Sequence, residues 1–110
     1  MAAPVSVHLH GEKVMIEIER DRGPGRGANL LVLDGAFRPL AVKEVVLVLT
    51  NPLAGIEPMR RIATRTGEST WRIDDLRIPL AGRWSLRAEI VVGDFEKLTI
   101  EDTVALPRVP

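Results

Sequence analysis

Cysteine is absent from the 110 residues of this sequence. Its absence excludes a disulfide framework, a thiolate zinc site and a cysteine nucleophile, but it leaves the cellular compartment open. A charge of one sign is also lacking, because Lys plus Arg and Asp plus Glu both number 15. No broad positive field is therefore available to hold nucleic acid phosphates, and we expect no nucleic acid partner.

Long apolar runs and catalytic residue types are scarce as well. The longest bulky aliphatic run, VVLVL at 45–49, is far shorter than the roughly 20 residues that a membrane helix needs. The first residues, MAAPVSV, have neither the basic nor the apolar region of a signal peptide. With two histidines close together and only three serines, a nucleophile, base and orienting group are hard to assemble, and we expect no enzyme.

Apolar residues at alternate positions recur over most of the length, and Gly, Pro, Asn and Asp separate these runs at short intervals. The pattern predicts one all-β domain over residues 1–110, an immunoglobulin-like antiparallel β-sandwich of about seven to eight strands. An open barrel is the alternative. Residues 45–49 are apolar on both faces of the expected strand, which indicates a central strand. Trp71 and Trp84 are expected to anchor the core between the sheets.

The segment DFEK, residues 94–97, is expected to form the tight connection between the last two strands. A three-residue loop there would place Ile90 opposite Leu98. Phe95 is expected to act as an apolar anchor within this connection.

The stretch VSVHLHGEK, residues 5–13, holds both histidines of the chain one residue apart. Gly11 and Glu12 fit a two-residue turn of type II′, with Gly at the position that needs a positive φ. This turn would place His8 directly opposite Met15. If Gly11 were instead a bulge within one continuous strand, His8 and Met15 would be too far apart to hold one ion.

In either arrangement, His8, His10 and Met15 lie on the same outward face. Imidazole suits copper in both oxidation states, and the thioether of methionine selects Cu(I). The pattern therefore predicts a copper site formed by His8, His10 and Met15. The alternative is that these residues form an ordinary solvated strand face without a metal.

Several longer pieces carry a family resemblance. HLHGEKVMIEI, NPLAGIEP, GRWSLRAEIVV and DFEK resemble the C-terminal extracytoplasmic domain of the CopD family of copper-resistance and copper-transport membrane proteins. The similarity runs from Val5 to Leu106. It implies a sandwich related to immunoglobulin-like and YtkA-like folds, with copper as the cargo. With that cargo, His8 and His10 are the main candidate ligands, Met15 is a weaker one and Met59 is weaker still. It also implies a location in the periplasm or at the outer face of the cytoplasmic membrane.

The resemblance has further implications for organisation and partners. We expect the chain to be a domain excised from a larger membrane protein, and its partners to be a copper ion, the membrane portion of that protein and a CopC-like copper chaperone. Two functions follow as alternatives. One is a domain that binds or passes copper, and the other is a metal-free interaction or structural module that docks a partner or its own membrane portion. A large exposed apolar patch would favour the second.

Overall fold

The computed structural model describes residues 6–21, 26–94 and 96–108. In these ranges the chain forms nine β-strands and one short 3-10 helix. The elements are β1 (Ser6–His10), β2 (Val14–Arg20), β3 (Ala28–Asp34), β4 (Glu44–Asn51), η1 (Pro52–Ala54), β5 (Ile56–Ile62), β6 (Thr64–Arg65), β7 (Thr70–Ile73), β8 (Gly82–Val91) and β9 (Lys97–Leu106).

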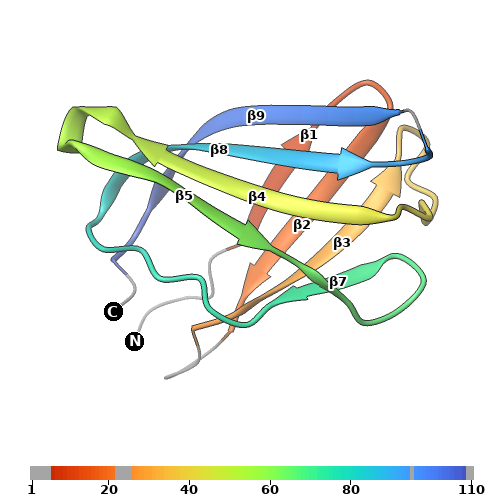
Figure 1. The fold of residues 1–110 in the computed structure, drawn as a ribbon, viewed down its shortest axis with the longest axis horizontal. Helices are drawn as coiled ribbons and strands as arrows, with labels where there is room; N and C mark the ends of the chain where they lie inside the picture. The colour runs from red at the N-terminus through yellow and green to blue at the C-terminus, as the bar shows by residue number, and fades with distance from the viewer. Residues whose placement is uncertain (1–5, 22–25, 95, 109–110) are drawn as a thin grey trace.

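The strands form two antiparallel sheets that pack as a sandwich (Figure 1). The five-stranded sheet has the order β1-β2-β3-β7-β6, and the four-stranded sheet has the order β5-β4-β8-β9. The predicted all-β sandwich is therefore confirmed. The strand count is higher than predicted because β6 has only two residues and carries no apolar run that a pattern could identify. None of the helices in the described ranges is long and apolar enough to cross a membrane.

The core lies between the sheets and is built from alternate residues of each strand. Trp84 is fully buried, and its Nε1 donates a hydrogen bond to the carbonyl oxygen of Leu80 at 3.1 Å. Trp71 is also buried in this core, so the expected roles of both tryptophans are confirmed. The prediction for residues 45–49 is confirmed too, because β4 lies between β5 and β8 and is buried along most of its length.

The connection between β8 and β9 has the predicted register. Ile90 lies opposite Leu98, and Ala88 lies opposite Ile100. The backbone N–H of Val92 donates to the carbonyl oxygen of Glu96 at 3.0 Å and closes the turn. Phe95, the expected anchor, lies outside the described residues.

The first hairpin differs from the prediction in its register. His10, rather than His8, lies opposite Met15. The turn is therefore centred on Glu12 and Lys13 rather than on Gly11 and Glu12, and the N–H of Gly11 donates to the carbonyl oxygen of Val14 at 2.8 Å. The bulge alternative is also wrong, because β1 and β2 pair as a hairpin. A shift of two residues leaves every side chain on its face, so the apolar pattern alone did not fix this register.

Candidate functional site

The outer face of the five-stranded sheet consists of rows of side chains that run across the strands. The first row is His10, Met15 and Leu33; the second is His8, Glu17, Leu31 and Thr70; the third is Ser6, Glu19, Asn29 and Arg72. Neighbouring strands lie about 4.8 Å apart, and successive rows are separated by about 6.7 Å. Side chains that are adjacent within this grid can therefore interact.

All three predicted copper ligands lie on this face. His8 and His10 are exposed, whereas Met15 is only 8% exposed. Met15 lies between His10 and Leu33 in the first row and is not part of the apolar cluster between the sheets. Met15 is therefore buried by its neighbours on the outer face of the sheet. The closest pairing of donors across strands is His10 with Met15, and His8 stands one row away.

Phe37 stands beside the histidines at the end of this face. Its ring centroid lies 6.2 Å from that of His10, and its side chain is 63% exposed. Its φ of 63° is in the left-handed region, which for a residue other than glycine costs on the order of 1 kcal/mol. Asp34 holds this turn by accepting hydrogen bonds from the N–H groups of Ala36 at 2.8 Å and Arg38 at 3.0 Å. The backbone hydrogen bonds from Arg38 and then Ala36 lower the pKa of Asp34.

The donor set available for a metal is small. Across the three described ranges, no three side chains of the His, Cys, Asp and Glu types gather closely enough to hold a metal ion. Glu17, although opposite His8, therefore does not complete a set with the two histidines. A third donor on this face has to be the thioether of Met15. Met59 lies on β5 and packs against the core, which places it away from the hairpin.

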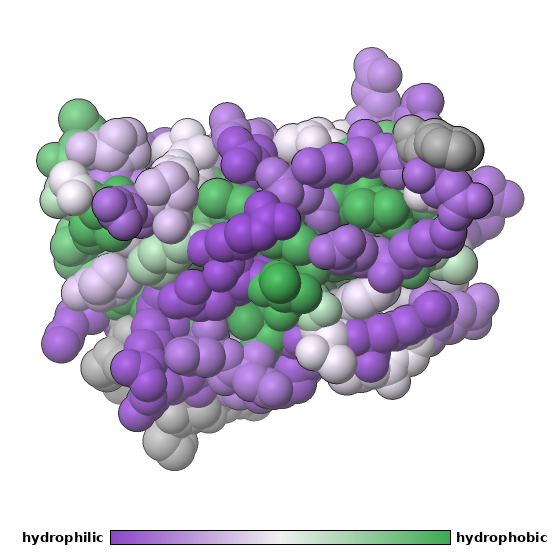
Figure 2. Space-filling view, in the orientation of Figure 1, coloured by the Kyte–Doolittle hydropathy of each residue, from purple (hydrophilic) through white to green (hydrophobic). Residues whose placement is uncertain are grey.

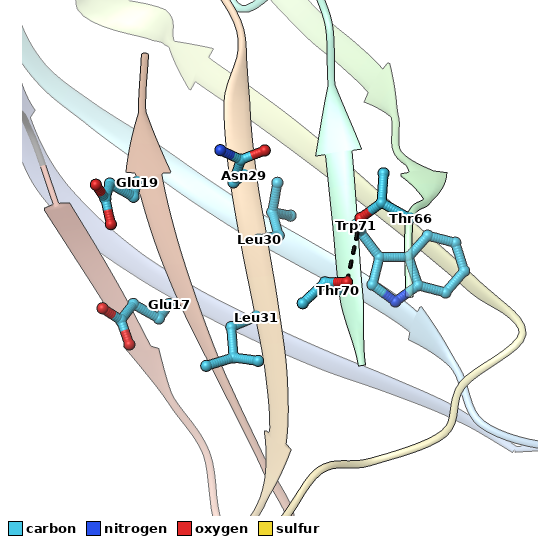
Figure 3. A pocket seen from close by; sticks show the side chains of 8 residues that line it. All are labelled: Glu17, Glu19, Asn29, Leu30, Leu31, Thr66, Thr70 and Trp71. Carbon is cyan, nitrogen blue, oxygen red and sulfur yellow. Dashed lines mark hydrogen bonds between the residues drawn. The ribbon is translucent and has the colours of Figure 1, made fainter. Parts of the chain in front are cut away.

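A groove occupies the second and third rows (Figure 3), and one of its residues, Glu17, lies opposite His8. Its volume is about 380 Å³, and it is lined by Glu17, Glu19, Asn29, Leu30, Leu31, Thr66, Thr70 and Trp71. Leu31 lies between Glu17 and Thr70 in the second row. The sequence analysis did not identify this groove. The feature of the sequence that could have indicated it is Leu31, an apolar residue at an outward-facing position of β3.

Arg72 closes one end of the third row and is already fully engaged. Its guanidinium donates to Asp21 at 2.6 Å, to Asp74 at 3.0 Å and to Asn29 at 3.1 Å. The side-chain hydrogen bond from Arg72 is the main cause of the lowered pKa of Asp21, and the same hydrogen bond raises the pKa of Arg72. Arg72 therefore stabilises the connection after β2, and its charge does not neutralise the carboxylates of the groove.

The carboxylates of the groove are in a different situation. Glu17 is half-buried and Glu19 is exposed, and within the described ranges neither takes part in an ion pair. Arg65, next to the groove residue Thr66, donates instead to the carbonyl oxygens of the turn before β7, including that of Gly67 at 2.9 Å. The outer face therefore combines two imidazoles, one thioether and two uncompensated carboxylates.

No family model, curated protein or solved structure matches this chain. The two-sheet antiparallel sandwich is established by the structure itself, and no family is identified. The resemblance to the CopD family therefore remains a hypothesis that depends on the sequence pieces given above.

Proposed function

We propose that this chain is an extracytoplasmic accessory domain of a copper transport or resistance membrane protein, and that it binds or passes a copper ion at the first hairpin. The observation that supports the proposal most directly is the common outward facing of His8, His10 and Met15, with His10 opposite Met15. Both imidazoles are exposed, which suits a site that exchanges its ion with a partner.

The chemistry of the donors favours copper over harder metals. Two imidazoles and a thioether match the preference of Cu(I), whereas Mg²⁺ and Ca²⁺ prefer oxygen ligands. Met15 is covered by its neighbours, so its sulfur is the less accessible donor. We therefore assign His8 and His10 as the principal ligands and Met15 as the donor that adds selectivity for Cu(I).

A metal-free interaction module is the second candidate. It is favoured by Phe37, which exposes an aromatic ring from a strained backbone next to His10. Strain of this kind is retained where surrounding structure supports it and often marks a binding site. In this alternative, the same face docks a partner or the membrane portion of the parent protein without a metal.

Calorimetric titration with Cu(I) and Cu(II) separates the two candidates. We expect binding of one ion that is lost in the His8→Ala/His10→Ala variant. Met15→Leu should weaken Cu(I) binding by about tenfold and leave Cu(II) binding unchanged, because thioether sulfur prefers the softer ion.

Met59→Leu is the matched control for the methionine, because Met59 lies in the other sheet and packs against the core. It should bind copper as the unchanged protein does. Thermal unfolding of each variant checks that the sandwich is retained. Equal copper binding by the unchanged protein and a folded His8→Ala/His10→Ala variant would overturn the proposed site and favour the metal-free module.

A further inference from the structure

We propose that the groove on the outer face of the five-stranded sheet binds a basic side chain, a lysine or arginine presented by a partner polypeptide. This site is separate from the proposed copper ligands, although Glu17 of the groove lies opposite His8. The proposal depends on the shape of the groove, its charge and the chemistry of its two walls.

The charge of the groove selects a cation. Glu17 and Glu19 are two residues apart on β2 and point to the same face, about 6.7 Å apart along the strand. A cationic group between them would be within reach of both carboxylates. In the described part of the chain these carboxylates have no ion-pair partner, so a ligand would not have to displace one. Phosphates and other anions would be repelled.

The floor of the groove suits the aliphatic part of the same side chain. Leu31 lies in the middle of the second row, between Glu17 and Thr70. Lysine and arginine bury their methylene stems against apolar surface while the charged group remains with polar partners. A stem that crosses Leu31 would therefore bring its cationic end to the carboxylates.

The opposite wall supplies polar groups for a peptide backbone. The hydroxyl groups of Thr66 and Thr70 lie 3.2 Å apart and form the hydrogen bond drawn in Figure 3, and the amide of Asn29 lies in the third row. Trp71 also lines the groove and is 4% exposed. Its indole belongs to the core between the sheets, so the polar groups on this side of the groove are those of Thr66, Thr70 and Asn29.

The position of the groove favours a side chain that belongs to a macromolecule. The groove lies on the face of a sheet between β2 and β6 (Figure 3), where another protein surface can approach. Its volume of about 380 Å³ is at the lower end of the range of about 300 to 1,000 Å³ that is usual for small-ligand sites. It therefore has room for one side chain and its flanking peptide groups.

NMR titration of the metal-free protein with short peptides tests the proposal. The probes are the acetylated and amidated tripeptides Ala-Lys-Ala and Ala-Arg-Ala, with Ala-norleucine-Ala as the uncharged control. We expect the basic peptides to shift the backbone amide signals of Glu17, Leu31 and Thr70. The Glu17→Gln/Glu19→Gln variant should bind at least about tenfold more weakly.

Glu101→Gln/Asp102→Asn is the matched control, because it removes the same number of charges from exposed positions of β9 in the other sheet. It should bind within about twofold of the unchanged protein. The proposal is overturned if the basic peptides cause no shifts, if the norleucine peptide causes the same shifts, or if both variants weaken binding equally. The His8→Ala/His10→Ala variant should still bind the peptides, so failure of the copper site and failure of the groove are distinguishable.

Discussion

The outer faces of the two sheets differ in whether their carboxylates form ion pairs. On the four-stranded sheet, the side chain of Glu89 is only 12% exposed, and its carboxylate lies 3.1 Å from Arg60, 3.3 Å from Arg87 and 3.5 Å from Lys97. The two glutamates of the groove on the five-stranded sheet have no such partners in the described ranges. One face therefore neutralises its partly buried carboxylate with its own cations, whereas the other leaves carboxylates available.

The two faces also differ in how they treat apolar side chains. On the four-stranded sheet, Val46 and Val48 point outward from β4 and are still buried. Val48 lies between Arg60 and Arg87 across the strands, and long arginine stems can cover such residues. Figure 2 shows a hydrophilic surface with apolar side chains in small patches between the charged ones.

This difference indicates which face is free to bind. Where ion pairs cover an apolar layer, a ligand would have to displace interactions that the fold already makes. Where imidazoles, a thioether and carboxylates have no hydrogen-bond or ion-pair partner among the described residues, binding adds interactions at little cost to the fold. The five-stranded sheet is therefore the better candidate for function, and the four-stranded sheet for stability.

The largest expected effect compares an apolar residue from each outer face. Val46→Ala should lower the free energy of unfolding by about 1.6 kcal/mol, because it removes two buried carbon groups worth about 0.8 kcal/mol each. Leu31→Ala removes more atoms, but Leu31 is only half-buried, and its loss should cost about 1 kcal/mol. Urea denaturation of both variants measures the difference. A larger loss for Leu31→Ala would contradict the view that the four-stranded face is the structural one.

A smaller effect is expected from the carboxylates. Glu89→Gln should lower stability at neutral pH by about 1 kcal/mol, because a network of ion pairs can exceed the contribution of a single exposed pair. Glu17→Gln, which removes no ion pair in the described ranges, should change stability by less than about 0.5 kcal/mol. Equal losses in the two variants would remove the contrast between the faces.

The pH dependence provides a second measurement of the same contrast. Burial is the largest effect on Glu89 and opposes its ionisation, but the hydrogen bond from Arg60 and the charges of Lys97, Arg60 and Arg87 together lower its pKa below the ordinary 4.5. A carboxylate whose pKa is lower in the folded state than in the unfolded state stabilises the fold at pH values above the unfolded-state pKa. This contribution is lost as the pH falls through the folded-state pKa. Below about pH 4.5, stability should therefore fall less steeply in Glu89→Gln than in the unchanged protein.

Much of the fold could be predicted from the sequence, because period-two alternation identifies strands and their buried faces. The same alternation placed His8, His10 and Met15 on one face correctly. It could not distinguish a pairing of His8 with Met15 from the observed pairing of His10 with Met15, since a shift of two residues preserves the facing. Beyond the outward-facing Leu31, nothing in the sequence indicated the groove, because Glu17 and Thr70 are brought to either side of Leu31 only by the pairing of β2 with β3 and of β3 with β7.

The smallest expected effect concerns Phe37, which is, among the described residues, the only residue other than glycine with a positive φ. Asparagine tolerates the left-handed region better than phenylalanine. Phe37→Asn should therefore raise the free energy of unfolding by about 0.5 kcal/mol, as measured by thermal or urea denaturation. If the variant is instead less stable, the packing of the ring beside His10 outweighs the backbone strain, and Phe37 is a structural part of this face. A stabilised variant would mean that the exposed ring is retained at a cost to stability, as expected for a residue that contacts a ligand or partner.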